Sequence, residues 1–171
     1  MTSGEVHAWN ILNRQPVIAK WENGMFTEIT PTNDNPAHDK WIGPPLVDLQ
    51  INGFAGIDFQ KDKLSTDELI HATSALESSG CSKFFFTLIT NEWDIMTERL
   101  ARAKELRDKH PKLKQAIAGW HIEGPFLSSE TGYCGAHPPN LMLEATVERL
   151  TKIREITEKD PVLLTMAPEI E

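Results

Sequence analysis

The segment at residues 119–125, Gly-Trp-His-Ile-Glu-Gly-Pro, contains the residue types best suited to chemistry in this chain. An apolar run precedes it and a Gly-Pro pair ends it, which predicts a buried strand followed by a loop. His121 and Glu123 then share a face, because alternate side chains of a strand point the same way. An ionisable pair at the carboxyl end of a buried parallel strand is how α/β enzymes place catalytic groups. A solvated strand end with a stray charge is also compatible with this segment taken alone.

A second polar set accompanies an earlier candidate strand. Residues 46–52 alternate apolar side chains with Asp48, Gln50 and Asn52, and Gly53 stops the run. A surface strand would show the same alternation, so the pattern is ambiguous without its neighbours. If the strand belongs to a parallel sheet, these polar residues become candidates for the same face as the histidine and the glutamate.

The elements that must position these residues follow one another as alternating strands and helices. Ser65 and Glu68 form a capping-box pattern that predicts the start of a helix, and Gly80 is placed to end it. Asn91 is expected to cap a second helix. The expected elements in order are a strand at 46–52, a helix at 65–79, a strand at 81–89, a helix from 91, a strand at 116–123, a loop at 126–143, a helix around 147–153 and a strand at 162–166. This alternation predicts a parallel sheet with helices outside it.

The N-terminal residues have a different character. Asn23-Gly24 separates two β-prone runs, at 17–21 and 25–29, and predicts a hairpin. Residues 31–40 are rich in Pro, Asn and Asp and are expected to form a linker. We therefore expect N-terminal strands and a linker at 1–40, followed by an α/β part at 41–171.

Composition narrows the classes of function. The chain has 171 residues and a net charge of -8, which disfavours nucleic acid and anionic membranes as partners. It has no apolar run near the length of a membrane span and no secretory signal is visible, so we expect a cytoplasmic protein. Cys81 and Cys134 stand far apart and outside any Cys-x-x-Cys pattern, which favours free thiols in a reducing compartment.

Four segments resemble the amidohydrolase superfamily and, within it, the N-acetylglucosamine-6-phosphate deacetylase family. Their order and spacing match throughout, and the match covers nearly the whole chain. The most specific feature is His-x-Glu-Gly-Pro followed about a dozen residues later by Gly-x-His. The four segments are residues 45–53, residues 80–90, residues 121–127 with 135–140, and residues 166–169.

The resemblance implies a fold and an activity. The family is a (β/α)₈ TIM barrel of the metal-dependent amidohydrolase type with a small β-sandwich domain, and this chain is expected to supply the sandwich's N-terminal strands and the barrel's first half. The implied reaction is hydrolysis of the acetamide of N-acetylglucosamine 6-phosphate to glucosamine 6-phosphate and acetate, in amino-sugar catabolism. The implied partner is this small amino-sugar phosphate, and the full-length protein is expected to be a homodimer.

The resemblance also assigns roles to individual residues. Glu123 matches the family's metal-ligand glutamate, which implies one divalent ion such as Zn²⁺. Ala136 matches a position that contacts substrate through its backbone, and His137 beside it is a further candidate for substrate binding. The family's two histidine ligands and its catalytic aspartate match no residue of this chain and are expected beyond residue 171.

Gln50 and Asn52 occupy the positions where some relatives carry a His-x-His pair. Neutral amides are poor Zn²⁺ ligands, so these residues imply the single-metal branch of the superfamily. Together with His121, they are expected to surround the metal site rather than to bind the ion.

The length of the barrel part limits the expectation. A full barrel needs about 250 residues, whereas residues 41–171 supply about 130. We therefore expect the N-terminal part of a longer deacetylase, inactive by itself. Two alternatives stay open: another amidohydrolase, such as a cyclic amidase or a deaminase, and a catalytically dead remnant that acts as a binding module. A nucleotide-binding domain is disfavoured because no Gly-x-Gly-x-x-Gly follows a strand.

Overall fold

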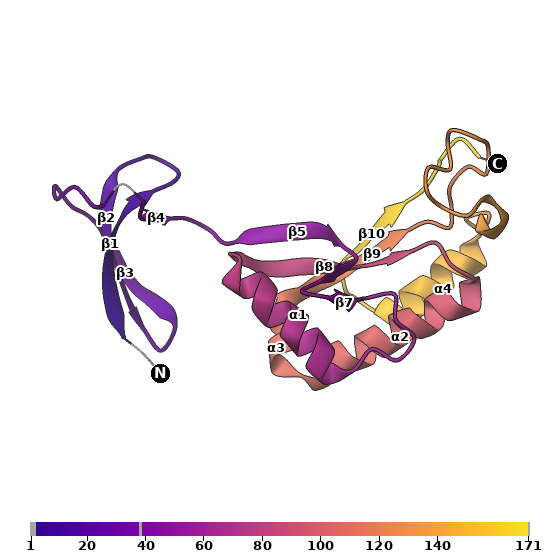
Figure 1. Cartoon of the computed structure of the whole chain (residues 1–171), viewed down its shortest axis with the longest axis horizontal. Helices are drawn as coiled ribbons and strands as arrows, with labels where there is room; N and C mark the ends of the chain where they lie inside the picture. The colour runs from indigo at the N-terminus through magenta and orange to yellow at the C-terminus, as the bar shows by residue number, and fades with distance from the viewer. Residues whose placement is uncertain (1–2, 38, 171) are drawn as a thin grey trace. The chain divides into compact units, whose positions relative to one another are not determined.

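A computed structural model describes residues 3–37 and 39–170 of the chain. The chain divides into two compact units, Met1–Pro44 and Pro45–Glu171. Figure 1 traces both units and labels their helices and strands. Within the described residues, no helix is long and apolar enough to span a membrane.

The first unit is a four-stranded sheet in the order β3-β2-β1-β4. The hairpin predicted at Asn23-Gly24 is confirmed: β2 and β3 pair antiparallel, and the two turn residues have φ angles of 54° and 78°. Positive φ at both positions is the geometry that Asn-Gly favours between twisted strands. The strands are β1 (Gly4–Asn10), β2 (Pro16–Glu22), β3 (Met25–Pro31) and β4 (Trp41–Ile42).

The boundary between the units lies after Pro44, four residues beyond the expected end at residue 40. The reason is β4, because Trp41 and Ile42 pair in parallel with Trp9 and Asn10 of β1 and so belong to the first sheet. The described residues of this unit form one sheet only, so its place in a β-sandwich is still a prediction.

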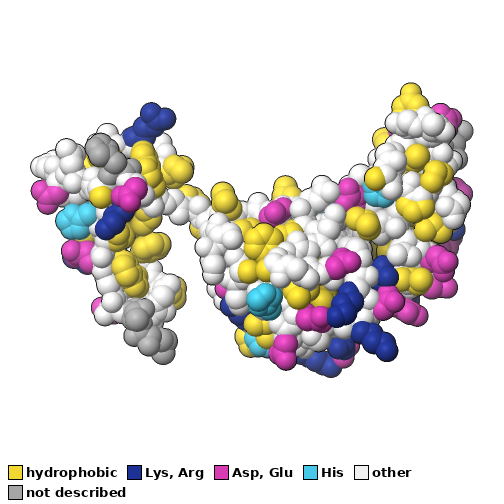
Figure 2. All heavy atoms as spheres, viewed as in Figure 1, with side chains coloured by type: hydrophobic (Ala, Val, Ile, Leu, Met, Phe, Trp, Pro, Cys, Tyr) yellow, Lys and Arg dark blue, Asp and Glu magenta, His cyan; other side chains and the backbone are white. Residues whose placement is uncertain are grey.

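Several large apolar side chains of the first unit are exposed. Figure 2 shows hydrophobic side chains gathered on the visible surface of this unit. On the strands of this sheet, Met25 is 74% exposed, Phe26 57%, Ile29 50% and Trp41 50%, and in the loop after β1 Ile11 is 57% and Leu12 79% exposed. A four-stranded sheet by itself has no second layer to cover such residues.

The second unit confirms the predicted α/β class. Its sheet has the order β10-β9-β8-β5, and every neighbouring pair of strands is parallel. Figure 1 shows the helices along one side of this sheet. The main elements are β5 (Leu46–Ile51), α1 (Thr66–Ser78), β8 (Cys81–Ile89), α2 (Trp93–Lys109), α3 (Pro111–Ala116), β9 (Ile117–Glu123), α4 (Val147–Thr157) and β10 (Val162–Thr165).

Local signals define the ends of α1. The Ser65 side chain accepts a hydrogen bond from the Glu68 N–H, and the Glu68 carboxylate accepts one from the Ser65 N–H, so both halves of the predicted capping box are present. Gly80 has a φ angle of +89°, a conformation that L side chains rarely adopt. The chain therefore leaves the helix at the predicted residue and enters β8.

The helices differ from the expectation in two ways. The N-cap of α2 is Glu92, and Asn91 precedes it and accepts a hydrogen bond from the Glu92 N–H instead of capping the helix. The short helix α3 was not predicted, although Pro111 at its first turn is a typical start signal. Six residues carry too little periodicity for a helix to be recognised.

Short elements after β5 and β9 complete the unit. Strands β6 (Gly53–Phe54) and β7 (Ile57–Asp58) form a small antiparallel hairpin directly after β5. The long loop expected at 126–143 is present and contains one 3₁₀ turn, η1 (Pro139–Leu141). Both connections lie after strands of the parallel sheet, where functional loops of α/β proteins are found.

The core fills the space between the sheet and its helices. Phe59 stacks on Phe86 with ring centroids 4.6 Å apart, and the Trp120 ring meets Phe86 edge-on at 5.9 Å. All three side chains are 1% exposed or less. Burying a side chain of this size contributes about 1.5–3 kcal/mol, so this cluster is a main source of the unit's stability.

The expected alternation of β5 is broken. Val47 pairs with Lys83 but Ile51 pairs with Phe86, and a register shift lies between Asp48 and Ile51. Such an irregularity moves the residues after it to the other face. Ile51 is therefore buried in the core at 7% exposure, whereas Val47 is 51% exposed, and the predicted common face of Val47 and Ile51 does not exist.

Candidate active site

The carboxyl ends of β8, β9 and β10 meet at one edge of the parallel sheet. Glu123 is the last residue of β9 and stands beside Ile89 of β8 and Thr165 of β10 in the two ladders. Parallel α/β sheets carry their functional groups at this edge. The segment at residues 119–125 therefore lies where a parallel sheet carries its functional groups.

The carboxylate of Glu123 has an unsatisfied oxygen. Its Oε2 atom is buried and has no hydrogen-bond partner within the described residues. A buried carboxylate oxygen without a partner carries a desolvation penalty that a cation or a hydrogen-bond donor would remove. The Glu123 carboxylate is therefore suited to bind a cation or a hydrogen-bond donor that does not belong to the described residues 3–37 and 39–170.

His121 is held on both sides of its ring. Nδ1 lies 3.3 Å from the Thr87 hydroxyl on β8, and Nε2 lies 2.8 Å from the Thr165 hydroxyl on β10. The Thr87 hydroxyl also accepts a hydrogen bond from the Ile51 N–H of β5 at 2.9 Å. This chain of polar contacts crosses all four strands of the sheet.

Burial determines the charge of His121. Only 3% of the residue is exposed. Desolvation lowers the pKa of His121, and the nearby Glu123 carboxylate opposes this shift more weakly. The neutral imidazole is therefore favoured, and both of its nitrogens already have a threonine partner.

His137 approaches Glu123 through Thr90. The Thr90 hydroxyl lies 2.8 Å from Nδ1 of His137 and donates to the backbone oxygen of Glu123 at 3.3 Å. His137 is half-buried, and Ala136 before it is exposed. The structure thus brings the start of the loop after β8 together with the long loop after β9, through Thr90 and His137.

Gln50 and Asn52 are exposed and lie apart from these contacts. The Gln50 N–H donates to the Asp48 carboxylate at 2.9 Å, and the Asn52 backbone oxygen accepts from the Phe59 N–H at 3.0 Å. Among the described residues, no hydrogen bond joins either side chain to Glu123. Nor does any group of three or more His, Cys, Asp or Glu in this part of the chain have the arrangement of a metal site.

Sequence reasoning missed the polar residues that support this edge. Gln60 donates from Nε2 to the Thr87 backbone oxygen at 2.9 Å and accepts from the Ile89 N–H at 3.2 Å, so its amide pairs with the part of β8 that extends beyond the ladder with β5. The threonines at positions 87, 90 and 165 are equally central. A signal was present, since each threonine lies at or near the predicted end of a strand, but threonine is also common in strands for packing alone.

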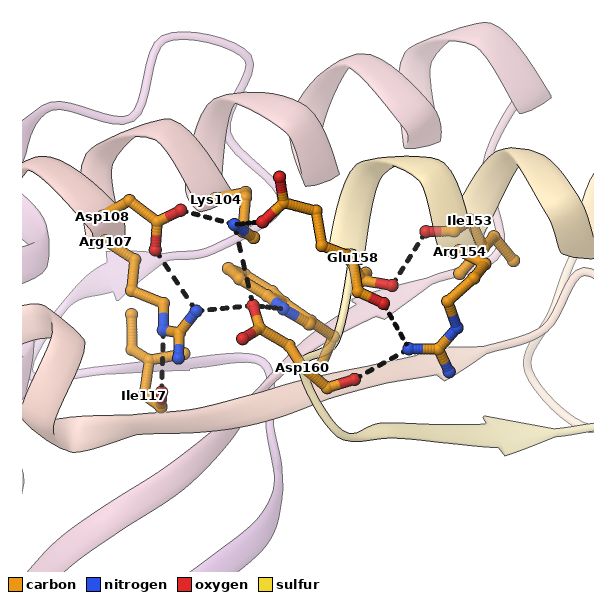
Figure 3. A network of polar contacts seen from close by, with 10 residues as sticks. Lys104, Arg107, Asp108, Ile117, Ile153, Arg154, Glu158 and Asp160 are labelled. Carbon is orange, nitrogen blue, oxygen red and sulfur yellow. Dashed lines mark hydrogen bonds and ion pairs between the residues drawn. The ribbon is translucent and has the colours of Figure 1, made fainter.

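A polar network lies at the opposite, amino-terminal end of the same strands (Figure 3). Arg107 of α2 donates to the Ile117 backbone oxygen at 3.0 Å and pairs with Asp160 at 2.5 Å. Asp160 also accepts from the Trp120 indole N–H at 3.0 Å. Lys104 adds ion pairs to Asp108 and Glu158. Because this network lies at the end of the sheet away from Glu123, we assign it a role in stability rather than in catalysis.

No protein-family model matches the chain. The sequence is similar to curated N-acetylglucosamine-6-phosphate deacetylases. The Bacillus subtilis protein is 29% identical over 133 residues, which cover 77% of this chain and 33% of the relative. The Haemophilus influenzae protein is 35% identical over 104 residues, which cover 60% of this chain and 26% of the relative. An N-acetylgalactosamine-6-phosphate deacetylase of Escherichia coli O157:H7 is 24% identical over 128 residues, covering 75% of this chain and 33% of that protein.

Solved structures share the fold. An N-acetylglucosamine-6-phosphate deacetylase from Thermotoga maritima superposes with a TM-score of 0.77 at 24% identity, over 97% of this chain and 42% of that one. A mutant of the Mycobacterium smegmatis enzyme in complex with N-acetyl-D-glucosamine-6-phosphate gives 0.76 at 21% identity, over 100% of this chain and 45% of that one.

These likenesses confirm the resemblance predicted from the sequence: the chain is similar to one part of these deacetylases and has the fold of that part. It spans a quarter to a third of the length of the curated relatives that it matches.

Proposed function

We propose that this chain supplies part of the active site of a metal-dependent N-acetylglucosamine-6-phosphate deacetylase. The reaction is hydrolysis of the substrate's acetamide to glucosamine 6-phosphate and acetate, a step of amino-sugar catabolism. The observation that carries the proposal is the similarity, at 29% and 35% identity, to deacetylases of two bacteria over most of the chain. The unsatisfied Glu123 oxygen at a strand's carboxyl end supports it.

The fold proposal follows from the same match. Strands β5, β8, β9 and β10 would be the first four strands of a (β/α)₈ barrel, with α1, α2 and α4 as the first outer helices. The parallel order of these strands and the helices along one side of their sheet support this assignment. The first unit would be the N-terminal part of a small β-sandwich, which gives a role to its exposed apolar side chains.

Glu123 would hold the metal. Its buried Oε2, which has no partner within the described residues, fits a divalent cation, and Zn²⁺ accepts carboxylate oxygen as a ligand. When bound, such an ion lowers the pKa of a coordinated water and polarises the amide carbonyl. The remaining ligands and the aspartate that serves as general base would come from residues beyond the described part of the chain. Gln50 and Asn52, as exposed amides, favour the single-metal form.

His137 and Ala136 would contact the sugar phosphate. His137 is half-buried, and its Nδ1 is engaged by Thr90, which leaves Nε2 for the substrate. Ala136 is exposed and offers its backbone groups. His121 would hold the strand ends rather than bind the ion, because both of its ring nitrogens have threonine partners.

Location and assembly belong to the same proposal. The whole protein would be a cytoplasmic homodimer, which the family resemblance supports. Cys81 and Cys134 are both free and buried, which fits a reducing compartment.

The test is acetate release in the presence of Zn²⁺, measured with the 171-residue chain and with the longest product of its gene. The substrates are N-acetylglucosamine 6-phosphate, N-acetylgalactosamine 6-phosphate and unphosphorylated N-acetylglucosamine. We expect a longer product to prefer the first substrate and the 171 residues alone to be inactive. Equal turnover of all three substrates, or none of the first by any product, would contradict the proposal.

A further inference from the structure

Thr90 joins two parts of the candidate site that are distant in sequence. It follows β8 directly and is 5% exposed. Its Oγ1 donates to the backbone oxygen of Glu123 at 3.3 Å and lies 2.8 Å from Nδ1 of His137. One buried hydroxyl thus contacts both the strand end that carries the carboxylate and the loop that carries the imidazole.

The backbone of Gly124 packs closely against the Thr90 hydroxyl. A Cβ at position 124 would lie 2.1 Å from Oγ1 of Thr90, far inside any real contact. The φ angle of Gly124 is +82°, which also favours glycine. The backbone after Glu123 therefore packs directly onto the Thr90 hydroxyl, and a small shift of either would disturb the other.

The hydrogen bonds of Thr90 determine which ring nitrogen of His137 carries the proton. A threonine hydroxyl has one proton to donate and can accept in addition. Thr90 satisfies both contacts at once when it donates to the Glu123 carbonyl and accepts from an Nδ1–H of His137. In that tautomer Nε2 has a lone pair and can accept a hydrogen bond, as from a sugar hydroxyl.

We propose that Thr90 is a positioning residue, which fixes the spacing between Glu123 and His137 and holds His137 in its Nδ1–H tautomer. The effect of this role on turnover rests on the proposed deacetylase function, whereas the effect on the imidazole does not. A purely structural threonine would influence stability and leave the His137 tautomer unchanged.

The first arm of the test measures the tautomer by long-range ¹H–¹⁵N correlation spectra of the histidine rings in the 171-residue chain. A His137→Gln spectrum identifies the signals of this residue. We compare Thr90→Val, which removes the hydroxyl at nearly constant size, with Thr90→Ser, which keeps it. The matched control is Thr73→Val, because Thr73 is fully buried and its hydroxyl has no partner within the described residues.

We expect the wild type, Thr90→Ser and Thr73→Val to show one His137 tautomer with a protonated Nδ1. Thr90→Val should show Nε2–H as the major form, as in a histidine side chain without a partner. If Thr90→Val fails to fold, Thr90→Ala takes its place. An unchanged His137 spectrum in a folded variant without the hydroxyl would overturn the proposal, as would an Nε2–H tautomer in the wild type.

The second arm measures kcat and KM for N-acetylglucosamine 6-phosphate in the active gene product. Loss of one positioning hydrogen bond should lower kcat/KM about tenfold in Thr90→Val, with Thr90→Ser and Thr73→Val within about threefold of the wild type. Equal activity of Thr90→Val and wild type would also overturn the proposal. An inactive wild type would instead refute the proposed function, and the spectra would still decide the role of Thr90.

Discussion

Thr87 and His121 are joined across neighbouring strands, with Oγ1 of Thr87 3.3 Å from Nδ1 of His121 and both residues buried. The same hydroxyl accepts the Ile51 N–H at 2.9 Å. Three strands of the parallel sheet therefore depend on one threonine, just below the edge where Glu123 lies. Loss of this hydroxyl would leave buried polar groups on both neighbouring strands with a missing partner, which is costly in the protein interior.

Replacing Thr87 with valine should destabilise the chain by about 1–3 kcal/mol, because the Ile51 N–H would remain buried without an acceptor. Thr73→Val is the control, since the Thr73 hydroxyl has no partner within the described residues, and its free energy of unfolding should change by less than about 0.5 kcal/mol or rise. Urea unfolding of both variants provides the comparison. An equal loss of unfolding free energy in the two variants would show that the hydrogen bonds of Thr87 do not stabilise the fold.

Gly124→Ala should be more harmful than Gly132→Ala, although both glycines have positive φ angles, of +82° and +94°. At Gly132 nothing lies within 4 Å of an added Cβ, so only backbone strain of about 1–2 kcal/mol applies. At Gly124 the methyl group would strike the Thr90 hydroxyl at 2.1 Å. We expect a loss at least about 1 kcal/mol larger, measured by thermal unfolding. A Gly124→Ala variant as stable as Gly132→Ala would mean that the Thr90 contact is not tight.

The sequence predicted best where local rules decide the structure. The capping box of Ser65 and Glu68 involves residues three apart, and the Asn23-Gly24 turn needs no distant partner. The strand that ends at Glu123 was recognisable because an apolar run meets Gly-Pro. Each of these signals is contained in a few consecutive residues, which is why they could be read without the fold.

The supporting contacts of the site could not be predicted in the same way. Thr90 and His137 are 47 positions apart and meet only because a long loop folds back on the sheet. The register shift in β5, which separates Val47 from Ile51, depends on how that strand pairs with β8. Both features are determined by tertiary packing, which cannot be predicted from a few consecutive residues.

Asp160→Asn tests the network at the amino-terminal end of the strands. The change would remove the shorter ion pair of Arg107, which is 8% exposed, and leave only its 3.3 Å pair with Asp108. It would also weaken the bond from the Trp120 indole. Because the Asp160 side chain is itself 20% exposed, we expect a loss of about 1–3 kcal/mol, less than for a fully buried pair. Asp62→Asn is the control, since Asp62 is 74% exposed in its pair with Arg99 and should contribute less than about 1 kcal/mol. Denaturant midpoints that fall equally would contradict this ranking.

The helix cap at Glu68 should make stability depend on acid pH. Hydrogen bonds from Lys61 and Ser65 lower the pKa of Glu68 from 4.5 to about 2. As the pH falls, the Glu68 carboxylate takes up a proton in the unfolded chain before it does so in the folded chain. The ionised Glu68 therefore contributes fully to the stability of the fold above pH 4.5, and this contribution is lost as the pH falls toward 2. Glu68→Gln keeps a capping acceptor but cannot titrate. The difference in melting temperature between wild type and Glu68→Gln should therefore shrink between pH 4.5 and pH 2, and a constant difference would contradict the assignment.

We propose that Glu123 holds a catalytic metal ion in a deacetylase. The direct measurement is bound Zn²⁺ and acetate release from N-acetylglucosamine 6-phosphate, in the active gene product carrying Glu123→Gln. Glu130→Gln, an exposed carboxylate in the following loop, is the control. We expect Glu123→Gln to lower the affinity for Zn²⁺ at least about tenfold and to reduce kcat by about 100-fold or more, with Glu130→Gln unchanged. Wild-type Zn²⁺ affinity and turnover in a folded Glu123→Gln variant would contradict the claim.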